Sequence, residues 1–492
     1  MRLINTTTVR LEEFSEANCP PYAILSHTWA NEEVTFQEMQ LERPPLGRAG
    51  YEKILQTCHQ ALAHQLDYAW IDTCCIDKSS STELSEAINS MFRWYAKAKI
   101  CFAYLADIHN KDSDVNIVKS RWFTRGWTLQ ELIAPRVLLF YSSDWRAIGS
   151  RDAFRDQISE STRIGANVLR DMIPNIHHEL SLSSIAQRMS WAAGRQTTRK
   201  EDLAYCLLGI FGINMPLLYG EGERAFLRLQ EKIIRHTDDH SIFAWRLNSL
   251  FTWRNSPMWS DFNGVLATTP NESAESRDVV SIETGEDSTP FLHTYRGIQI
   301  NLRVFHRGTG SLVFGILHYR IGHAGSLIAI PLTAHAGRIF GRHLGPPWEL
   351  VMQEEWKRLP SQSVYLATTS VRPEKYQIPF DNILVKPLPK NVSWGGVSKG
   401  YRYDHAAHLI EPEKHESSSR GIADQTVEIT FHKRLKRSKA TESLSISVTF
   451  HPLNGHIWRG RKHTLTYNVK HTNASSRYKC FATVKANKVF GQ

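Results

Sequence analysis

One acidic residue, Glu131, stands alone in the aromatic and apolar stretch SRWFTRGWTLQELIAP at residues 120–135. A carboxylate in a site that excludes water stabilises developing positive charge more strongly than it would in bulk water. Trp127 lies four residues earlier, on the same face of a predicted helix, where it would supply an aromatic wall. Glu131 is therefore our candidate catalytic residue, and Trp127 is a candidate for substrate binding.

The same residues also have a structural interpretation. The segment TLQE at 128–131 matches a capping box, in which Thr128 and Glu131 would satisfy free backbone N–H groups at a helix start. A carboxylate on a solvated helix face would look the same in sequence. The pattern alone leaves catalysis and capping open.

Polar and aromatic side chains also follow the predicted buried strands. Ser26, His27 and Trp29 end the first of these strands, and Asp72 follows the second. Ligands of open α/β sheets bind beyond the carboxyl ends of the strands, so we expect these residues to bind substrate. Arg125 would contact a phosphate or a carboxylate there. A buried structural role stays open for His27, and a surface role for Arg125.

Apolar runs and helical patterns alternate through the first 150 residues. This alternation predicts a parallel sheet with helices on both faces, and the near-continuous apolar runs predict strands that are buried on both sides. The predicted strands are 22–29, 67–75, 99–108 and 136–145, and the predicted helices are 50–66, 81–98 and a shorter one within 120–135.

The period changes further along the chain. We expect an α/β core at 1–150, a helical extension at 151–245 and a β-rich domain at 246–492. In the last of these, residues 297–305 place every second apolar side chain on one face, as do residues 443–450, which is typical of half-buried strands in a sandwich or barrel. We expect a sandwich-like fold, with polar loops near 267–290 and 411–425.

The charge is concentrated near the end of the sequence. The chain has a net charge of +10, and residues 401–492 hold 16 Lys and Arg against 7 Asp and Glu. Alternating strands flank the basic stretch, so we favour a strand edge that carries lysines and do not expect nucleic acid as a partner. Nuclear entry through residues 433–439 stays open.

Other bulk features bear on location and on metals. The sequence has no run of 18 apolar residues and no apolar segment near its start, so we expect no membrane span and no secretory signal. Seven cysteines then indicate reduced thiols and a cytoplasmic protein. No Cys or His pattern with metal-ligand spacing is present, so we expect no metal site.

Five motifs in a fixed order resemble the fungal heterokaryon incompatibility (HET) family over roughly residues 1–245. They are YAILSHTW, YAWIDTCCIDK, STELSEAINSMFRWYAKAKICFAYLAD, SRWFTRGWTLQELIAP and TTRKEDLAYCLLGIFGINMPLLYGEGERAFLRLQ. The resemblance implies vegetative incompatibility: self/non-self recognition of unlike cells after fusion, which ends in programmed cell death. It implies further copies of the chain or other incompatibility proteins as partners. The sequence contains no P-loop GxxxxGK[ST], so a nucleotide-binding control layer is missing or is supplied by another protein.

The region around SRW…WTLQEL is also similar, more remotely, to TIR domains, which have a flavodoxin-like sheet. Some TIR domains cleave NAD with a glutamate in a WCLxEL-like helix, and Glu131 takes the place of that glutamate. This resemblance implies NAD as a substrate and no cofactor. A longer first helix and an insertion at 109–119 depart from the TIR pattern. Two hypotheses follow: an NAD hydrolase that acts after clustering, and a non-enzymatic module that recruits cell-death partners.

Overall fold

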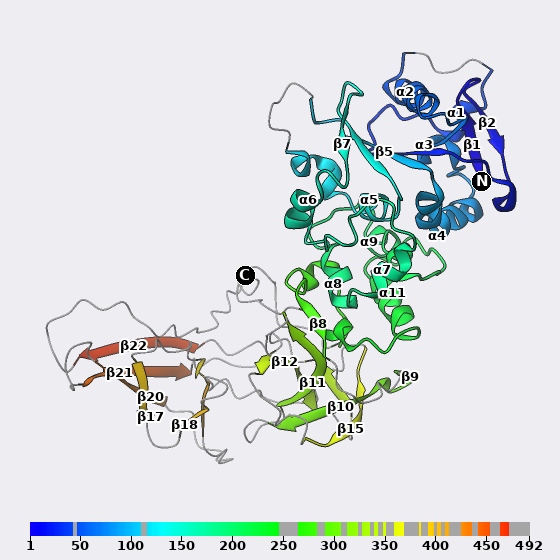
Figure 1. Cartoon of the computed structure of the whole chain (residues 1–492). Helices are drawn as coiled ribbons and strands as arrows, with labels where there is room; N and C mark the ends of the chain where they lie inside the picture. The colour runs from blue at the N-terminus through cyan, green and yellow to red at the C-terminus, as the bar shows by residue number, and fades with distance from the viewer. Residues whose placement is uncertain are drawn as a thin grey trace. The chain divides into compact units, whose positions relative to one another are not determined.

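The structure is a computed structural model with two compact units. It describes residues 1–42, 47–109, 116–245, 264–282, 291–306, 312–322, 327–334, 339–342, 348–350 and 359–368, and then the backbone of seven strands after residue 382. The first unit comprises Met1–Arg307 and Ser311–Arg372, and the second comprises Gly308–Gly310 and Pro373–Gln492. The chain is coloured from blue at the N-terminus to red at the C-terminus in Figure 1.

The first unit begins with a seven-stranded mixed sheet in the order β2-β1-β4-β3-β5-β6-β7. The four central strands are parallel, whereas β1, β2 and β7 pair antiparallel at the edges. The strands are β1 (Arg2–Asn5), β2 (Arg10–Glu13), β3 (Ala23–His27), β4 (Tyr68–Trp70), β5 (Ile100–Tyr104), β6 (Leu138–Tyr141) and β7 (Ala147–Ser150).

The order of the parallel strands fixes where a ligand crevice can open. From β3 the chain first crosses to β4 on one side, and it then returns to β5 on the other side. Such a reversal of strand order opens a crevice at the carboxyl ends of the two strands that flank it. Ser26 lies near that end of β3, in register with Ala103 of β5.

The helices of this region lie between the strands, as the sequence predicts. They are α1 (Phe36–Met39), α2 (Ala49–Ala63), α3 (Asp72–Cys75), α4 (Ser81–Lys97) and α5 (Thr128–Ile133). The prediction of α/β structure with a parallel sheet is confirmed, although it omitted the three antiparallel edge strands.

The prediction of a strand through residues 67–75 is wrong in its second half. Strand β4 ends at Trp70, and a helical turn begins at Asp72. The Cys75 N–H donates to the Ile71 carbonyl at 2.9 Å, which closes this turn. An acidic residue in the first turn favours a helix because it opposes the positive end of the peptide dipoles.

A helical segment follows the sheet. Its helices are α6 (Arg155–Thr162), α7 (Ile176–Ser181), α8 (Ile185–Ser190), α9 (Asp202–Tyr205), α10 (Leu208–Phe211) and α11 (Arg224–Ile234). It is joined to the sheet region at the loop before α5: the Gly126 N–H donates to the Gln196 carbonyl at 2.9 Å, and the Gln196 N–H donates to the Thr124 carbonyl at 2.7 Å.

A second sheet completes the first unit. Five of its strands pair in a closed ring, β10-β11-β12-β13-β15, which corresponds to a small barrel rather than to a sandwich. In β10 the alternating residues Ile298, Ile300, Leu302 and Val304 are buried, as predicted. The strands are β8 (Val279–Ser281), β9 (Leu292–Thr294), β10 (Gly297–His306), β11 (Leu312–Ile321), β12 (Leu327–Ala334), β13 (Ile339–Arg342), β14 (Trp348–Leu350) and β15 (Ser361–Leu366).

The second unit has two sheets. One contains β16 (Ile383–Leu384), β19 (Leu409–Pro412) and β18 (Tyr401–Asp404), and the other contains β17 (Val392–Val397), β20 (Gln425–Arg434), β21 (Thr441–Pro452) and β22 (His463–His471). Strand β20 pairs on both sides, so the prediction that its basic end forms a strand edge is wrong. Residues 435–440 lie outside the described residues.

Candidate functional site

The structure brings Glu131 and Ser26 into direct contact. The Ser26 hydroxyl donates a hydrogen bond to Oε2 of Glu131, and the Trp122 indole N–H donates to Ser26 Oγ at 2.8 Å. Glu131 is only 8% exposed, and Ser26 and Trp122 are buried. A chain of hydrogen bonds thus runs from Trp122, which precedes α5, through Ser26 at the carboxyl end of β3 to Glu131 on α5.

The environment of Glu131 favours its protonated form. Burial raises the pKa of its carboxyl to about 8, because a charge loses solvation there, and nearby Asp72 adds to this effect. Hydrogen bonds from Ser26 and Tyr95 and the positive charge of Arg195 oppose the shift. At neutral pH the carboxyl is mostly neutral, so a cation bound beside it would favour ionisation.

The helix that carries Glu131 is not held as a capping box would require. Its N-cap residue, Trp127, makes no side-chain cap hydrogen bond. The Thr128 hydroxyl donates instead to the carbonyls of Trp122, at 2.5 Å, and Arg125, at 2.9 Å. All six residues of α5 are buried, so the carboxyl of Glu131 is not on a solvated face. The capping interpretation of TLQE is therefore wrong.

A buried arginine from the helical segment fixes the start of α5. The guanidinium of Arg195 donates from Nη1 to the Arg125 carbonyl at 2.9 Å and to the Thr128 hydroxyl at 3.2 Å. Its Nε donates to the Trp191 carbonyl at 3.1 Å. Burial lowers the pKa of Arg195 to about 10, and the negative charge of Glu131 partly offsets this loss.

A second buried arginine fixes the end of the same helix. Arg151 donates to the carbonyls of Leu132 at 2.7 Å, Ile133 at 3.3 Å and Pro135 at 2.9 Å. It also pairs with Asp171 at 3.0 Å. Helices this short are unstable alone, so these contacts, together with packing, determine where Glu131 points.

Trp29 and Asp72 form a more exposed part of the site. The Trp29 indole N–H donates to Oδ2 of Asp72 at 2.9 Å, and the Lys78 ammonium lies 3.6 Å from the centre of the Trp29 ring. Trp29 is 55% exposed, which is unusual for so large an apolar side chain. Its free surface is available for stacking against a planar ligand group.

His27 lies between two carboxylates. Its Nε2 is 3.5 Å from Oε2 of Glu33, and its Nδ1 is 3.9 Å from Oδ1 of Asp72. Burial raises the pKa of Glu33, but the contact with His27 and an ion pair with Lys53 outweigh burial and lower that pKa to about 2. His27 thus links the Asp72 side of the site to Glu33, near the end of the loop between β3 and α1.

The two remaining candidates lie toward the helical segment. The half-buried Arg125 donates from Nη2 to the Thr198 hydroxyl at 3.3 Å. Trp127 contacts Asp202: burial raises the pKa of that carboxyl, and hydrogen bonds from Tyr219 and Trp127 lower it. The structure thus groups Ser26, Asp72 and Glu131, with His27 and Trp29 beside Asp72, and it places Arg125 and Trp127 against other partners.

Several residues that hold the site together were not among our candidates. Trp122 and Tyr95 lie within the quoted motifs. Each carries one hydrogen-bonding group on a largely apolar side chain, and the need of that group for a partner when buried was the signal that could have identified them. Arg195 gave no such signal, because it lies in a basic polar turn that reads as solvated. Among the described residues, no three His, Cys, Asp or Glu side chains gather closely enough to share a metal ion.

Comparison with known proteins identifies this region. Residues 22–116 match the model of the heterokaryon incompatibility protein (HET) family. The chain is also 45% identical over 233 residues to the vegetative incompatibility protein HET-E-1 of Podospora anserina. This chain carries a heterokaryon incompatibility domain. The matched HET residues include Ser26, His27, Trp29 and Asp72, and they end before Glu131.

Other comparisons set the extent of this likeness. The alignment to HET-E-1 covers 45% of this chain and 17% of that protein, so the chain spans about a sixth of the relative's length. After the HET domain, residues 224–294 match a domain of unknown function (DUF8212). No solved structure matches the chain. Within the described residues no helix has the length and apolar character needed to cross a membrane.

Proposed function

We propose that this protein is an effector of heterokaryon incompatibility that triggers programmed cell death by self-association and cleavage of NAD, with Glu131 as the central carboxylate. The observation that carries the proposal is the buried Glu131 carboxyl, hydrogen-bonded to Ser26 at the carboxyl end of β3. A carboxyl group in this position lies where α/β sheets bind nucleotides. The HET match supports the biological role, and the site supports the reaction.

The strand order supports the flavodoxin-like, TIR-like part of the proposal. Numbered along the chain, the parallel strands β3, β4, β5 and β6 lie in the order 2-1-3-4. Flavodoxin-like sheets have the order 2-1-3-4-5 and bind their ligand between the first and third strands. Ser26 lies on the first of these strands, and its partner Glu131 is on the helix before the fourth.

The proposed reaction is hydrolysis of the bond between nicotinamide and ribose. The C1′–N bond breaks and its electron pair stays on the ring nitrogen, which neutralises the pyridinium charge. Positive charge develops on C1′ and the ring oxygen, and ionised Glu131 stabilises it. Water adds to C1′ and loses a proton, which gives nicotinamide, ADP-ribose and H⁺. The pyridinium charge of bound NAD favours the ionised form of Glu131 beforehand.

The test is nicotinamide release by purified protein at high concentration. We expect Glu131→Gln to reduce the rate by about 100-fold or more, because loss of a group that stabilises transition-state charge costs that much. Glu86→Gln, an exposed site on α4, is the matched control and should keep the rate. Activity should rise with pH up to about 8, where Glu131 ionises. Full activity of Glu131→Gln would overturn the proposed site.

The alternative function is a non-enzymatic assembly module, and one observation favours it. Glu131 is 8% exposed and its carboxyl already accepts from Ser26, as a purely structural buried acid would. A cell-death assay separates the two functions. If Glu131→Gln folds, lacks NAD cleavage and still kills, while substitutions that break self-association do not kill, then the assembly function is correct.

A further inference from the structure

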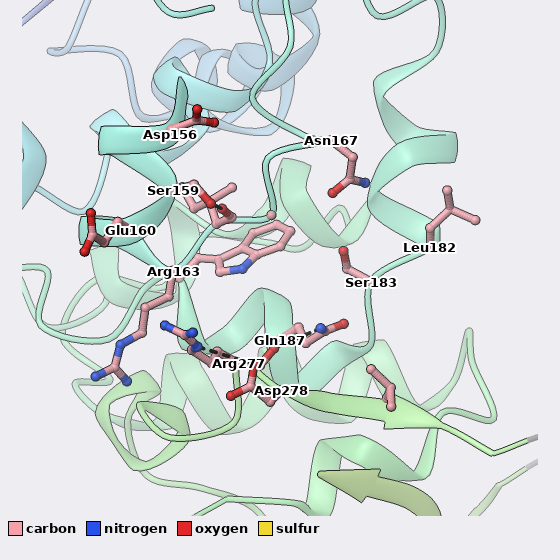
Figure 2. A pocket seen from close by; sticks show the side chains of 14 residues that line it. Asp156, Ser159, Glu160, Arg163, Asn167, Leu182, Ser183, Gln187, Arg277 and Asp278 are labelled. Carbon is pink, nitrogen blue, oxygen red and sulfur yellow. Dashed lines mark hydrogen bonds and ion pairs between the residues drawn. The ribbon is translucent and has the colours of Figure 1, made fainter. Parts of the chain in front are cut away.

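A cavity of about 650 Å³ lies in the helical segment, apart from Glu131. Figure 2 shows its walls: α6 contributes Asp156, Ser159 and Glu160, and the loop after α6 contributes Arg163 and Asn167. The other walls come from the residues just after α7, from α8 and from the residues just before β8, with Leu182, Ser183, Gln187, Arg277 and Asp278. Its volume is within the range of small-molecule sites.

Trp191 gives the cavity one aromatic and well-fixed wall. This side chain lines the cavity and is only 3% exposed, so its position is set by the surrounding core. Its indole N–H donates to no acceptor among the described residues, and it is not one of their buried unpartnered polar atoms, so it is open to the cavity. A ligand in the cavity could accept from this N–H or stack against the ring.

The charged walls favour neither an anionic nor a cationic ligand. Arg163 donates to the Ala274 carbonyl and lies 3.6 Å from Glu275, and Arg277 lies 3.3 Å from Asp278, so both cations have local partners. The lining contains three carboxylates, Asp156, Glu160 and Asp278. Together with the two arginines they give it a formal charge of −1. A phosphate would meet the carboxylates, and a strong cation would meet the arginines.

The remaining wall groups can both donate and accept. The Asn167 amide donates to Glu179 at 3.1 Å and keeps a free carbonyl oxygen, and the Ser183 hydroxyl has no partner among the described residues. Figure 2 shows these two side chains on the same side of the cavity. Hydroxyl groups match such mixed walls because each one donates and accepts at once.

We propose that this cavity is a second ligand site, separate from the one around Glu131, and that it binds an uncharged, hydroxyl-rich small molecule of the size of a mono- or disaccharide. Trp191 provides the aromatic wall, and Asn167 and Ser183 provide polar contacts. An apolar ligand is excluded because it would strip water from the polar walls without replacing its hydrogen bonds.

Saturation-transfer NMR on the full chain tests this site. The probes are glucose, galactose, mannose, N-acetylglucosamine and their β-1,4-linked disaccharides, with inorganic phosphate and AMP as charged comparators. We expect at least one sugar to bind and Asn167→Ala or Ser183→Ala to weaken it by about tenfold. Ser181→Ala is the matched control, because Ser181 lies just before the cavity, donates to the His178 carbonyl and is not part of the lining.

The outcomes are distinct. Binding of a sugar that both lining variants weaken, and that Ser181→Ala leaves unchanged, supports the site. Binding of phosphate or AMP without any sugar overturns the ligand class. Sugar binding that none of the three substitutions changes overturns the cavity as the site. The same conclusion follows if the wild-type chain unfolds cooperatively but binds none of the probes. None of these readouts depends on NAD cleavage.

Discussion

The Glu131 site and the cavity beside Trp191 use polar groups in opposite ways. Around Glu131, the polar atoms of Ser26 and Trp122 are buried and pair with each other. Around the cavity, Asp156, Glu160 and Arg277 are exposed. Both sites belong to the first unit and differ mainly in how much water reaches their charges.

This difference bears on the two roles that we propose, catalysis at Glu131 and ligand binding in the cavity. Removing water shifts the pKa of Glu131 and strengthens its interaction with charge that develops nearby. An open polar wall leaves its groups near their solution behaviour, so it can recognise a ligand without changing the ligand's bonds. Substitutions of the same type in the two places should therefore have very different effects.

The largest expected contrast is in the pH dependence of stability. The pKa of Glu131 is about 8 in the folded chain against an ordinary value of 4.5, so between these values the folded state holds a proton that the unfolded state has lost. The free energy of unfolding should fall as pH rises through this range, by about 1.4 kcal/mol per pH unit, and level off above pH 8.

Chemical denaturation of wild type and Glu131→Gln from pH 4.5 to 8.5 measures this contribution. Their difference should change by about 3–5 kcal/mol over the range. The matched variant in the cavity, Glu160→Gln, should alter the free energy of unfolding by less than about 0.5 kcal/mol. A difference between wild type and Glu131→Gln that stays constant with pH would contradict the raised pKa.

The next contrast concerns arginines. Arg151→Met should lower the free energy of unfolding by about 3–5 kcal/mol, because it leaves Asp171 and several buried carbonyls without a donor. Arg163→Met in the cavity wall should cost about 1 kcal/mol or less, since its ion pair with Glu275 is about half exposed. Urea denaturation at pH 7 measures both, and equal losses would remove the distinction between the two sites.

The smallest contrast concerns tryptophans. Trp122→Phe and Trp191→Phe remove similar volumes from the core, but only Trp122 donates its indole N–H, to Ser26. Trp122→Phe should therefore be more destabilising, by about 1 kcal/mol, which is the net value of one hydrogen bond. The comparison needs both variants in the same thermal or urea series. A larger loss for Trp191→Phe would indicate that its N–H has a partner in the free protein.

Sequence patterns predicted the sheet better than the site. The apolar runs around Ile24 and Phe102 require burial on both faces, and that requirement alone leads to parallel strands. The edge strands were missed because four-residue segments such as Arg2–Asn5 carry too little periodicity. Strand β4 ends at Trp70, and only the tertiary structure determined that a helical turn begins at Asp72.

For the site, the sequence pointed to Glu131 but not to what surrounds it. Residue type marks a carboxyl in an apolar stretch, whereas its partners depend on which distant segments fold against it. Arg195 lies 64 positions along the chain, and no local pattern separates it from a solvated arginine. Trp127 shows another limit of sequence patterns: it is the N-cap residue of α5, and spacing along a helix gave no sign that its indole contacts Asp202.

The hydrogen bond from Arg195 to the Trp191 carbonyl connects the Glu131 site to the wall of the cavity. Trp191 borders the cavity, and the same guanidinium acts on the charge of Glu131. A solute that displaced the peptide group of Trp191 would move Arg195 and so change the proton affinity of Glu131. By linkage, loss of the Glu131 proton would then change the affinity of the cavity for the solute by the same factor. The occupancy of the cavity would depend on pH, and the pKa of Glu131 would depend on that occupancy.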